Sequence, residues 1–130
     1  MKSVTYYARF CLEKDGGYSV IFPDLRIATQ GEDMQDSIEH AKNVLELWLD
    51  MKEDDNDIIY SPSTLEELEA EADDYWAIEN FDDEADRDYY RSCELSYEFV
   101  PITVTPPSEI YLSKMQPHPR TLIEEQRQSA

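Results

Sequence analysis

The sequence predicts an α+β fold in which one main helix packs on an antiparallel sheet, in the order β-β-β-α-β. Between residues 4 and 30, three short segments alternate apolar and polar side chains, as strands with one buried face do. After them, one long segment repeats apolar side chains every three or four residues, as an amphipathic helix does. A further β-rich run follows at residues 99–104. The 130 residues suffice for one modest core.

The first three strands are separated by clear turn signals. The alternation over residues 4–12 resumes at residues 18–22, and the Lys-Asp-Gly-Gly sequence at 14–17 favours a tight hairpin turn. Pro23 ends the second strand because proline cannot donate a hydrogen bond to the sheet. A third short strand is expected at residues 26–30.

A helix is predicted over residues 34–51. Asp33 is placed to cap it, and Asp36 stands three residues later in the capping-box position. One face of this helix is an apolar stripe that would lie across the sheet, and it consists of Ile38, Ala41, Leu45, Trp48 and Leu49. Val44 and Leu47 are expected to widen this stripe.

Residues 53–88 form an acidic segment in which Arg87 is the one basic residue. The Ser-Thr-Leu-Glu sequence at residues 63–66 has capping-box spacing, which predicts a short helix. The apolar residues that follow suit either a segment that packs back on the domain or one that orders against a partner, and both interpretations stay open. These residues are Tyr75, Trp76, Ile78 and Phe81.

The last predicted strand contains Pro101, which favours an edge position or a bulge. Ser108 is placed to cap a single helical turn. The chain is polar after Met115, so a frayed tail is expected. We therefore divide the chain into an α+β domain at residues 1–105, with an acidic insertion at about 53–92, and a C-terminal tail at 106–130.

The composition narrows the range of partners. The chain has 30 Asp and Glu against 11 Lys and Arg, a formal net charge of -19, which disfavours nucleic acid and anionic lipid and favours a basic protein partner. Cys11 and Cys93 lie in strand-like surroundings, and the N-terminal residues lack an apolar signal-peptide core, so a reduced, cytoplasmic protein is expected. No apolar run is long enough for a membrane helix.

Sequence motifs for catalysis are weak. The three glycines fall at residues 16, 17 and 31, so no nucleotide-binding glycine loop follows the first strands. His40 and His118 have no nucleophile at a strand-to-helix turn beside them. Runs of adjacent acids are usually solvated rather than metal-binding, which applies to residues 54–57 and 82–84. We predict no enzyme activity, no cofactor, no metal site and no small-molecule substrate.

The N-terminal third of the chain resembles the HicB antitoxins. Residues 7–25 contain, after a first strand, the Gly-Tyr pair, an apolar strand and Phe-Pro-Asp-Leu of that family's N-terminal domain, and residues 29–33 are similar to its Thr-x-Gly step into a helix. The resemblance implies a partial RNase H-like fold without the nuclease's catalytic residues, and assembly as a homodimer or higher homo-oligomer. It also implies neutralisation of a basic HicA-type mRNA-cleaving toxin by masking the toxin's active site.

The candidate partner-binding residues come from this resemblance and from the acidic segment. For several of them a structural role competes: Tyr18, Phe22 and Leu25 as core, and Asp24 as a turn acceptor rather than a contact to a toxin histidine. Glycines 17 and 31 would serve turn geometry. The full set is Gly17, Tyr18, Phe22, Asp24, Leu25, Thr29, Gly31, Trp76, Phe81, Asp82, Asp83 and Glu84.

The sequence departs from the HicB pattern after residue 105. Many HicB proteins carry a ribbon-helix-helix or helix-turn-helix module there, and none is readable at residues 106–130, so no direct DNA binding is expected from this chain alone. Three alternatives stay open: an acidic, nucleic-acid-mimicking inhibitor of another nucleic-acid-processing protein, an orphan HicB-like protein, and a small hydrolase or nuclease on the same kind of sheet.

Overall fold

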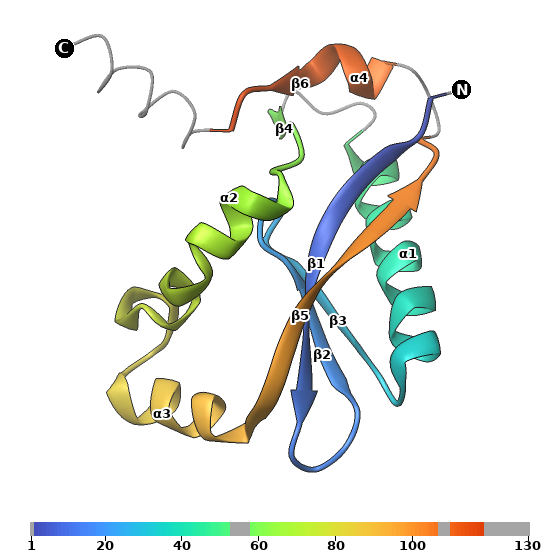
Figure 1. Ribbon diagram of the computed structural model, residues 1–130. Helices are drawn as coiled ribbons and strands as arrows, with labels where there is room; N and C mark the ends of the chain where they lie inside the picture. The colour runs from blue at the N-terminus through green and yellow to red at the C-terminus, as the bar shows by residue number, and fades with distance from the viewer. Residues whose placement is uncertain (1, 53–57, 107–109, 119–130) are drawn as a thin grey trace, which may run out of the picture.

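The computed structural model describes residues 2–52, 58–106 and 110–118 (Figure 1). It has the predicted α+β architecture, a four-stranded antiparallel sheet with one main helix on it. In chain order the elements are β1 (Val4–Glu13), β2 (Tyr18–Phe22), β3 (Ile27–Gly31), α1 (Met34–Met51), β4 (Ile59–Tyr60), α2 (Leu65–Ala70), the 3₁₀ helices η1 (Ala72–Trp76) and η2 (Ile78–Asn80), α3 (Glu84–Cys93), β5 (Glu94–Val104), α4 (Ile110–Lys114) and β6 (Met115–Gln116).

The sheet has the strand order β3-β2-β1-β5. The predicted hairpin joins β1 to β2, with Phe10 opposite Val20, and its turn holds Gly17 at φ +79°, a conformation that glycine adopts without strain. On the other side of β1, β5 pairs antiparallel along its whole length, with Val4 opposite Val104. The edge position of β5 confirms the interpretation of Pro101.

Helix α1 covers one face of the sheet and closes the core (Figure 1). Its bounds are those predicted, and Leu45 is fully buried, while Ile38 and Trp48 pack against the core from a half-buried position. Leu47 is 58% exposed, so its predicted place in the apolar stripe is wrong. It lies about 200° around the helix from Leu45, on the face turned to solvent.

The N-terminus of α1 begins as the capping signals predict, with one difference. The Asp33 side chain accepts a hydrogen bond from the Asp36 N–H at 2.7 Å, as expected of the cap. The Asp36 carboxylate accepts from the Glu32 N–H at 2.9 Å, one residue earlier than in a capping box. Just before them, a Cβ on Gly31 would lie 2.6 Å from the Ser37 backbone, so only glycine lets β3 approach α1 this closely.

The described part of the acidic segment, residues 58–88, packs back on the face of the sheet opposite α1 (Figure 1). Thr64 and Glu67 form the predicted capping box at the start of α2. The burial of Arg9 and Cys11 on this second face corrects the expectation that β1 has only one buried face, because Tyr75 of the acidic segment lies over Arg9. Helix α3, which was not predicted, leads directly into β5.

Residues 110–118 are held against the domain, although the sequence analysis places them in the tail. Tyr111 is fully buried in the core, and Met115 of β6 pairs with Ile59 of β4 in a short parallel ladder. The end of the predicted tail, residues 119–130, and the predicted cap at Ser108 lie outside the described residues. Within the described ranges no helix is long and apolar enough to cross a membrane.

Candidate functional site

A buried carboxylate, Asp24, joins three distant parts of the chain. It follows β2, and its Oδ2 accepts a hydrogen bond from the Ser63 N–H at 2.8 Å while its Oδ1 accepts from the Ser63 hydroxyl at 2.6 Å. The Nε2 of His118 lies 3.5 Å from Asp24 Oδ1. The carboxylate therefore ties the β2–β3 turn to the start of the acidic segment and to the C-terminal segment. This geometry favours the structural role of Asp24 over a contact to a partner histidine.

Tyr6 and Tyr60 extend the same corner of the molecule. The Tyr6 hydroxyl donates to the Tyr60 carbonyl at 2.5 Å, and the Tyr60 ring lies 5.6 Å from the His118 ring, centroid to centroid. Burial, followed by the negative charge of Asp24, raises the pKa of Tyr6 above its ordinary value. Tyr6 thus stays a hydrogen-bond donor at neutral pH.

On the face of the sheet opposite α1, Arg9 is the centre of a cation–aromatic cluster. Its guanidinium lies 3.9 Å from the ring centroid of Tyr75 and 4.2 Å from that of Tyr97, so both rings stack on the charge. Its Nη1 forms an ion pair with Glu94 at 2.6 Å and also contacts Cys11 Sγ. Its Nε and Nη2 atoms are buried and have no acceptor among the described residues.

Cys11 lies beside this ion pair. Burial, opposed in part by the positive charge of Arg9, raises the pKa of the Cys11 thiol to about 12. The thiol is therefore protonated at neutral pH. Both Cys11 and Cys93 are buried and free, which agrees with the expectation that they pack rather than pair.

A groove of about 1200 Å³ runs between the acidic segment and the face of the sheet opposite α1. We call it the sheet-face groove. Arg9, Ile21 and Phe99 line it from β1, β2 and β5, and Leu68 and Phe81 line it from the acidic segment. Asp74 and Glu79 are exposed on its rim, and at the end near α1 it is lined by Leu25, Arg26, Trp48, Lys52 and Ile58.

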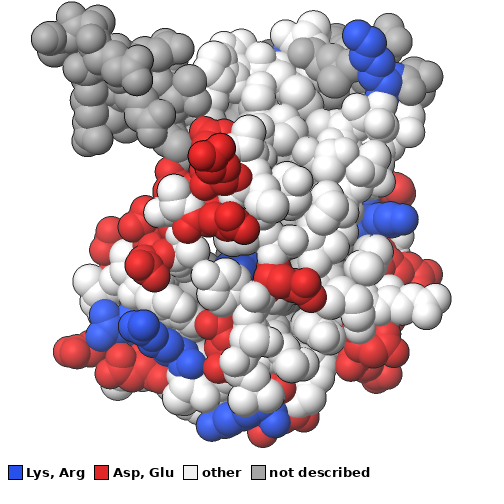
Figure 2. Space-filling view, in the orientation of Figure 1, with Lys and Arg blue, Asp and Glu red and all other residues white. Residues whose placement is uncertain are grey.

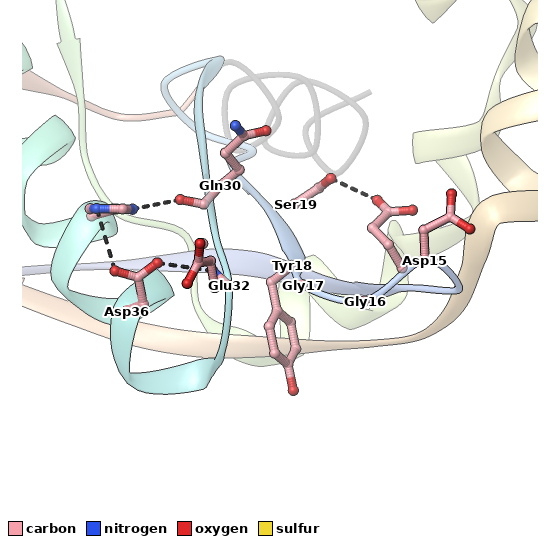
Figure 3. Close-up of a pocket in the computed structure, with 11 residues that line it drawn as sticks. Asp15, Gly16, Gly17, Tyr18, Ser19, Gln30, Glu32 and Asp36 are labelled. Carbon is pink, nitrogen blue, oxygen red and sulfur yellow. Dashed lines mark hydrogen bonds and ion pairs between the residues drawn. The ribbon is translucent and has the colours of Figure 1, made fainter.

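A second, smaller groove of about 630 Å³ lies at the turn between β1 and β2 (Figure 3). We call it the hairpin-end groove. It is lined by Gly17, Tyr18 and Gly31 from the predicted site, together with the carboxylates of Glu13, Asp15, Glu32 and Asp36. The backbone carbonyl of Gln30 and the carboxylate of Asp36 each contact the imidazole of His40 at the edge of this groove.

His40 is exposed, as expected for the polar face of α1. Its Nδ1 lies 2.7 Å from the Gln30 carbonyl, and its Nε2 lies 3.5 Å from Asp36 Oδ1. The hydrogen bond to Gln30, followed by the charge of Asp36, raises the pKa of His40. The hairpin-end groove therefore favours the protonated imidazole.

The structure does not bring the predicted partner-binding residues into one site. Gly17, Tyr18 and Gly31 line the hairpin-end groove, whereas Asp24, Leu25 and Phe81 line the sheet-face groove. Phe22 is fully buried in the core, and Thr29 is half-buried on β3 opposite Val20. Trp76 stacks on Phe81 with ring centroids 5.8 Å apart, and the exposed residues at the start of α3 are Asp82, Asp83 and Glu84.

Acidic side chains lie at both the left and the right of the face drawn in Figure 2. Figure 2 shows acidic side chains gathered over α2 and the segment after it, beside an uncharged area over the sheet. Among the described residues no three His, Cys, Asp or Glu side chains are placed to hold a metal ion together. The acidic run at residues 54–57 lies outside the described ranges.

Two features of the site were missed from the sequence, although both left a signal. Arg9 is the one charged residue between residues 3 and 12, inside an otherwise apolar and aromatic strand. Helix α3 is capped by Asp83, whose side chain accepts a hydrogen bond from the Asp86 N–H at 2.7 Å. The same Asp-x-x-Asp spacing starts α1 and could have identified α3.

The fold places the chain among α+β proteins in which one helix covers an antiparallel sheet. The structure is similar to a chain of a solved toxin–antitoxin complex from Streptococcus pneumoniae, with a TM-score of 0.57 and 23% sequence identity, over 99% of this chain and 90% of that chain. At this identity the likeness establishes a shared fold. No family model and no curated protein matches the sequence.

Proposed function

We propose that this chain is an antitoxin of the HicB type, which binds a small basic HicA-type mRNA-cleaving toxin and masks its active site. The observation that carries the proposal is the shared fold with a chain of a toxin–antitoxin complex over nearly the whole length of both chains. The HicB-like residues at 7–33 support the finer assignment, since they form the β1–β2 hairpin, the β2–β3 turn and the start of α1.

The charge distribution supports a basic partner. A formal net charge of -19 attracts a basic protein over the Debye length and accelerates its association. It also disfavours an independent approach to RNA or DNA, so the chain would act on the toxin and not on the toxin's substrate.

Co-expression tests the proposal. The proposal predicts a short basic protein encoded next to this gene, and that protein is the probe, produced from an inducible promoter with and without this chain. We expect the basic protein to arrest growth and this chain to restore it, with a stable complex on size exclusion. A catalytically inactive form of the basic protein, with its histidine replaced by alanine, should still bind. Growth arrest that this chain does not relieve would remove the antitoxin assignment.

The nucleic-acid-mimicking alternative predicts a different pattern. A mimic competes with substrate through its charge, so single exposed charge reversals anywhere on the molecule would weaken inhibition similarly. An antitoxin with a shaped interface would lose binding at one surface only. The same growth assay, repeated with exposed charge reversals spread over the molecule, separates the two functions.

A further inference from the structure

We propose that the sheet-face groove is where the partner docks, and that its occupant is an amphipathic, lysine- or arginine-bearing segment of a protein. The identity of that protein rests on the proposed function. The kind of segment rests on three features of the groove itself: an apolar lining, an acidic rim and a buried donor on the floor.

The apolar lining of the groove can bury an apolar face of the docked segment. Ile21, Phe81 and Phe99 are half-buried on the groove, and Ile58 is 56% exposed at its end. They come from strands β2 and β5 and from both ends of the acidic segment, so they form a lining rather than scattered surface residues. A segment with one apolar face would remove this area from water, which is the favourable term in groove binding.

The acidic rim of the groove favours a segment whose polar face is positively charged. Asp74 and Glu79 are exposed on the groove on either side of the end of η1. Arg26 and Lys52 line the other end, near the Asp24–Ser63 contact that precedes α2, and the Lys52 Nζ lies 5.6 Å from the Trp48 ring centroid. This separation of charge orients the occupant, with its basic side chains toward Asp74 and Glu79.

The floor of the groove holds Arg9, whose side chain is 2% exposed. Glu94 and Cys11 both meet its Nη1, while its Nε and Nη2 donors have no acceptor among the described residues. Buried donors are normally satisfied, and an acceptor supplied by the occupant would reach these two donors if the Tyr75 ring that covers the guanidinium moved aside. A backbone carbonyl of an inserted segment is such an acceptor, and it adds no charge to the acidic surroundings.

The hairpin-end groove provides a matched comparison surface. Its carboxylates make it at least as acidic as the sheet-face groove, yet its lining includes only one large apolar side chain, Tyr18. A partner attracted by negative charge alone would use the two surfaces alike. An amphipathic segment would discriminate between them.

The test measures binding of a synthetic amphipathic leucine–arginine peptide by fluorescence anisotropy, with a peptide of the same composition in scrambled order as its control. The charge variants are Asp74→Lys with Glu79→Lys at the groove, against Glu32→Lys with Glu39→Lys at exposed positions elsewhere. The apolar variants are Phe81→Ser at the groove and Leu47→Ser on the outer face of α1.

We expect the groove pair and Phe81→Ser each to raise Kd by about tenfold or more, and the control variants to raise it by less than about threefold. Equal losses from both charge pairs, equal binding of both peptides, or no binding of the amphipathic peptide would overturn the inference.

The same four variants are then measured with the basic protein encoded beside the gene. Binding of that protein that is insensitive to the groove variants would refute the groove while leaving the proposed function intact. If that protein does not bind at all, the proposed function fails, and the peptide result alone decides whether the groove takes a basic amphipathic segment.

Discussion

Removing Glu94 should destabilise the protein more than any other single loss of an ion pair that the structure describes. The Arg9 side chain is 2% exposed and that of Glu94 is 13% exposed, so their ion pair at 2.6 Å is almost fully withdrawn from water. Glu94→Ala leaves the guanidinium buried without its carboxylate. Breaking a buried pair in this way typically costs about 3–5 kcal/mol. We expect a loss toward the lower end of that range, because the rings of Tyr75 and Tyr97 still stack on the charge.

The double variant Arg9→Met with Glu94→Leu separates the cost of an unpaired charge from the value of the pair. Replacing both partners with apolar residues of similar size is often neutral or better, but here it also removes stacking worth about 1–2 kcal/mol. We therefore expect the double variant to lose about 2 kcal/mol or less. It should be more stable than Glu94→Ala.

Urea unfolding followed by tryptophan fluorescence measures both effects. Trp76, whose ring centroid lies 5.6 Å from the guanidinium carbon of Arg9, reports on this region. Glu98→Ala, an exposed carboxylate on the same strand, is the control and should change the free energy of unfolding by less than about 0.5 kcal/mol. A loss below about 1 kcal/mol for Glu94→Ala, or a double variant less stable than the single one, would refute this account of the cluster.

Four further results are expected. Asp24→Asn should lower the free energy of unfolding by about 2–3 kcal/mol in urea, because two charge-assisted hydrogen bonds from Ser63 lose their anionic acceptor; a loss under about 0.5 kcal/mol would contradict the role of the carboxylate. Trp48→Ala should lower the free energy of unfolding by about 1.5–3 kcal/mol. This loss is smaller than the roughly 3–5 kcal/mol of a fully buried ring because Trp48 is half-buried, and a neutral effect would contradict the packing of α1. Folded Cys11 keeps its proton between its ordinary pKa of 9.0 and about 12, whereas the unfolded chain releases it, so stability should fall as pH rises through that range. Urea midpoints at about pH 8 and about pH 10.5 should differ less in Cys11→Val, and an unchanged difference would exclude the thiol as a source. Finally, the chain alone should give no sequence-specific shift of the DNA upstream of its gene at micromolar concentration, and a salt-sensitive complex below about 1 μM would show a DNA-binding element that the sequence did not reveal.

The parts of the fold that local signals specify were predictable. Helix α1 has a cap, an acidic first turn and an apolar stripe within one stretch of 18 residues, and its predicted bounds are confirmed. Pro101 likewise confirmed an edge strand, because a missing N–H constrains its position whatever the rest of the chain does.

The parts that depend on distant contacts were not predictable. The acidic segment packs back because Tyr75 stacks on Arg9, 66 positions earlier in the chain, and no periodicity within the segment encodes that contact. Asp24 was expected to act as a hydrogen-bond acceptor within its turn, but the residue that donates to it, Ser63, lies 39 residues away. The candidate residues do not gather at one place because they lie at opposite ends of β2: Gly17 and Tyr18 line the hairpin-end groove, whereas Asp24 and Leu25 follow the other end of the strand and line the sheet-face groove.

The pairing of β1 with β5 sets the order in which the sheet can be completed. Val4 pairs with Val104 and Glu13 pairs with Glu94, so β1 cannot complete its pairing until β5, the last strand of the sheet, has been synthesised. Until then β1 is an outer strand with unpaired backbone groups, and non-local pairing of this kind is slow. A polypeptide interrupted before Glu94 has no such closure and offers the open edge of β1 to any strand it meets.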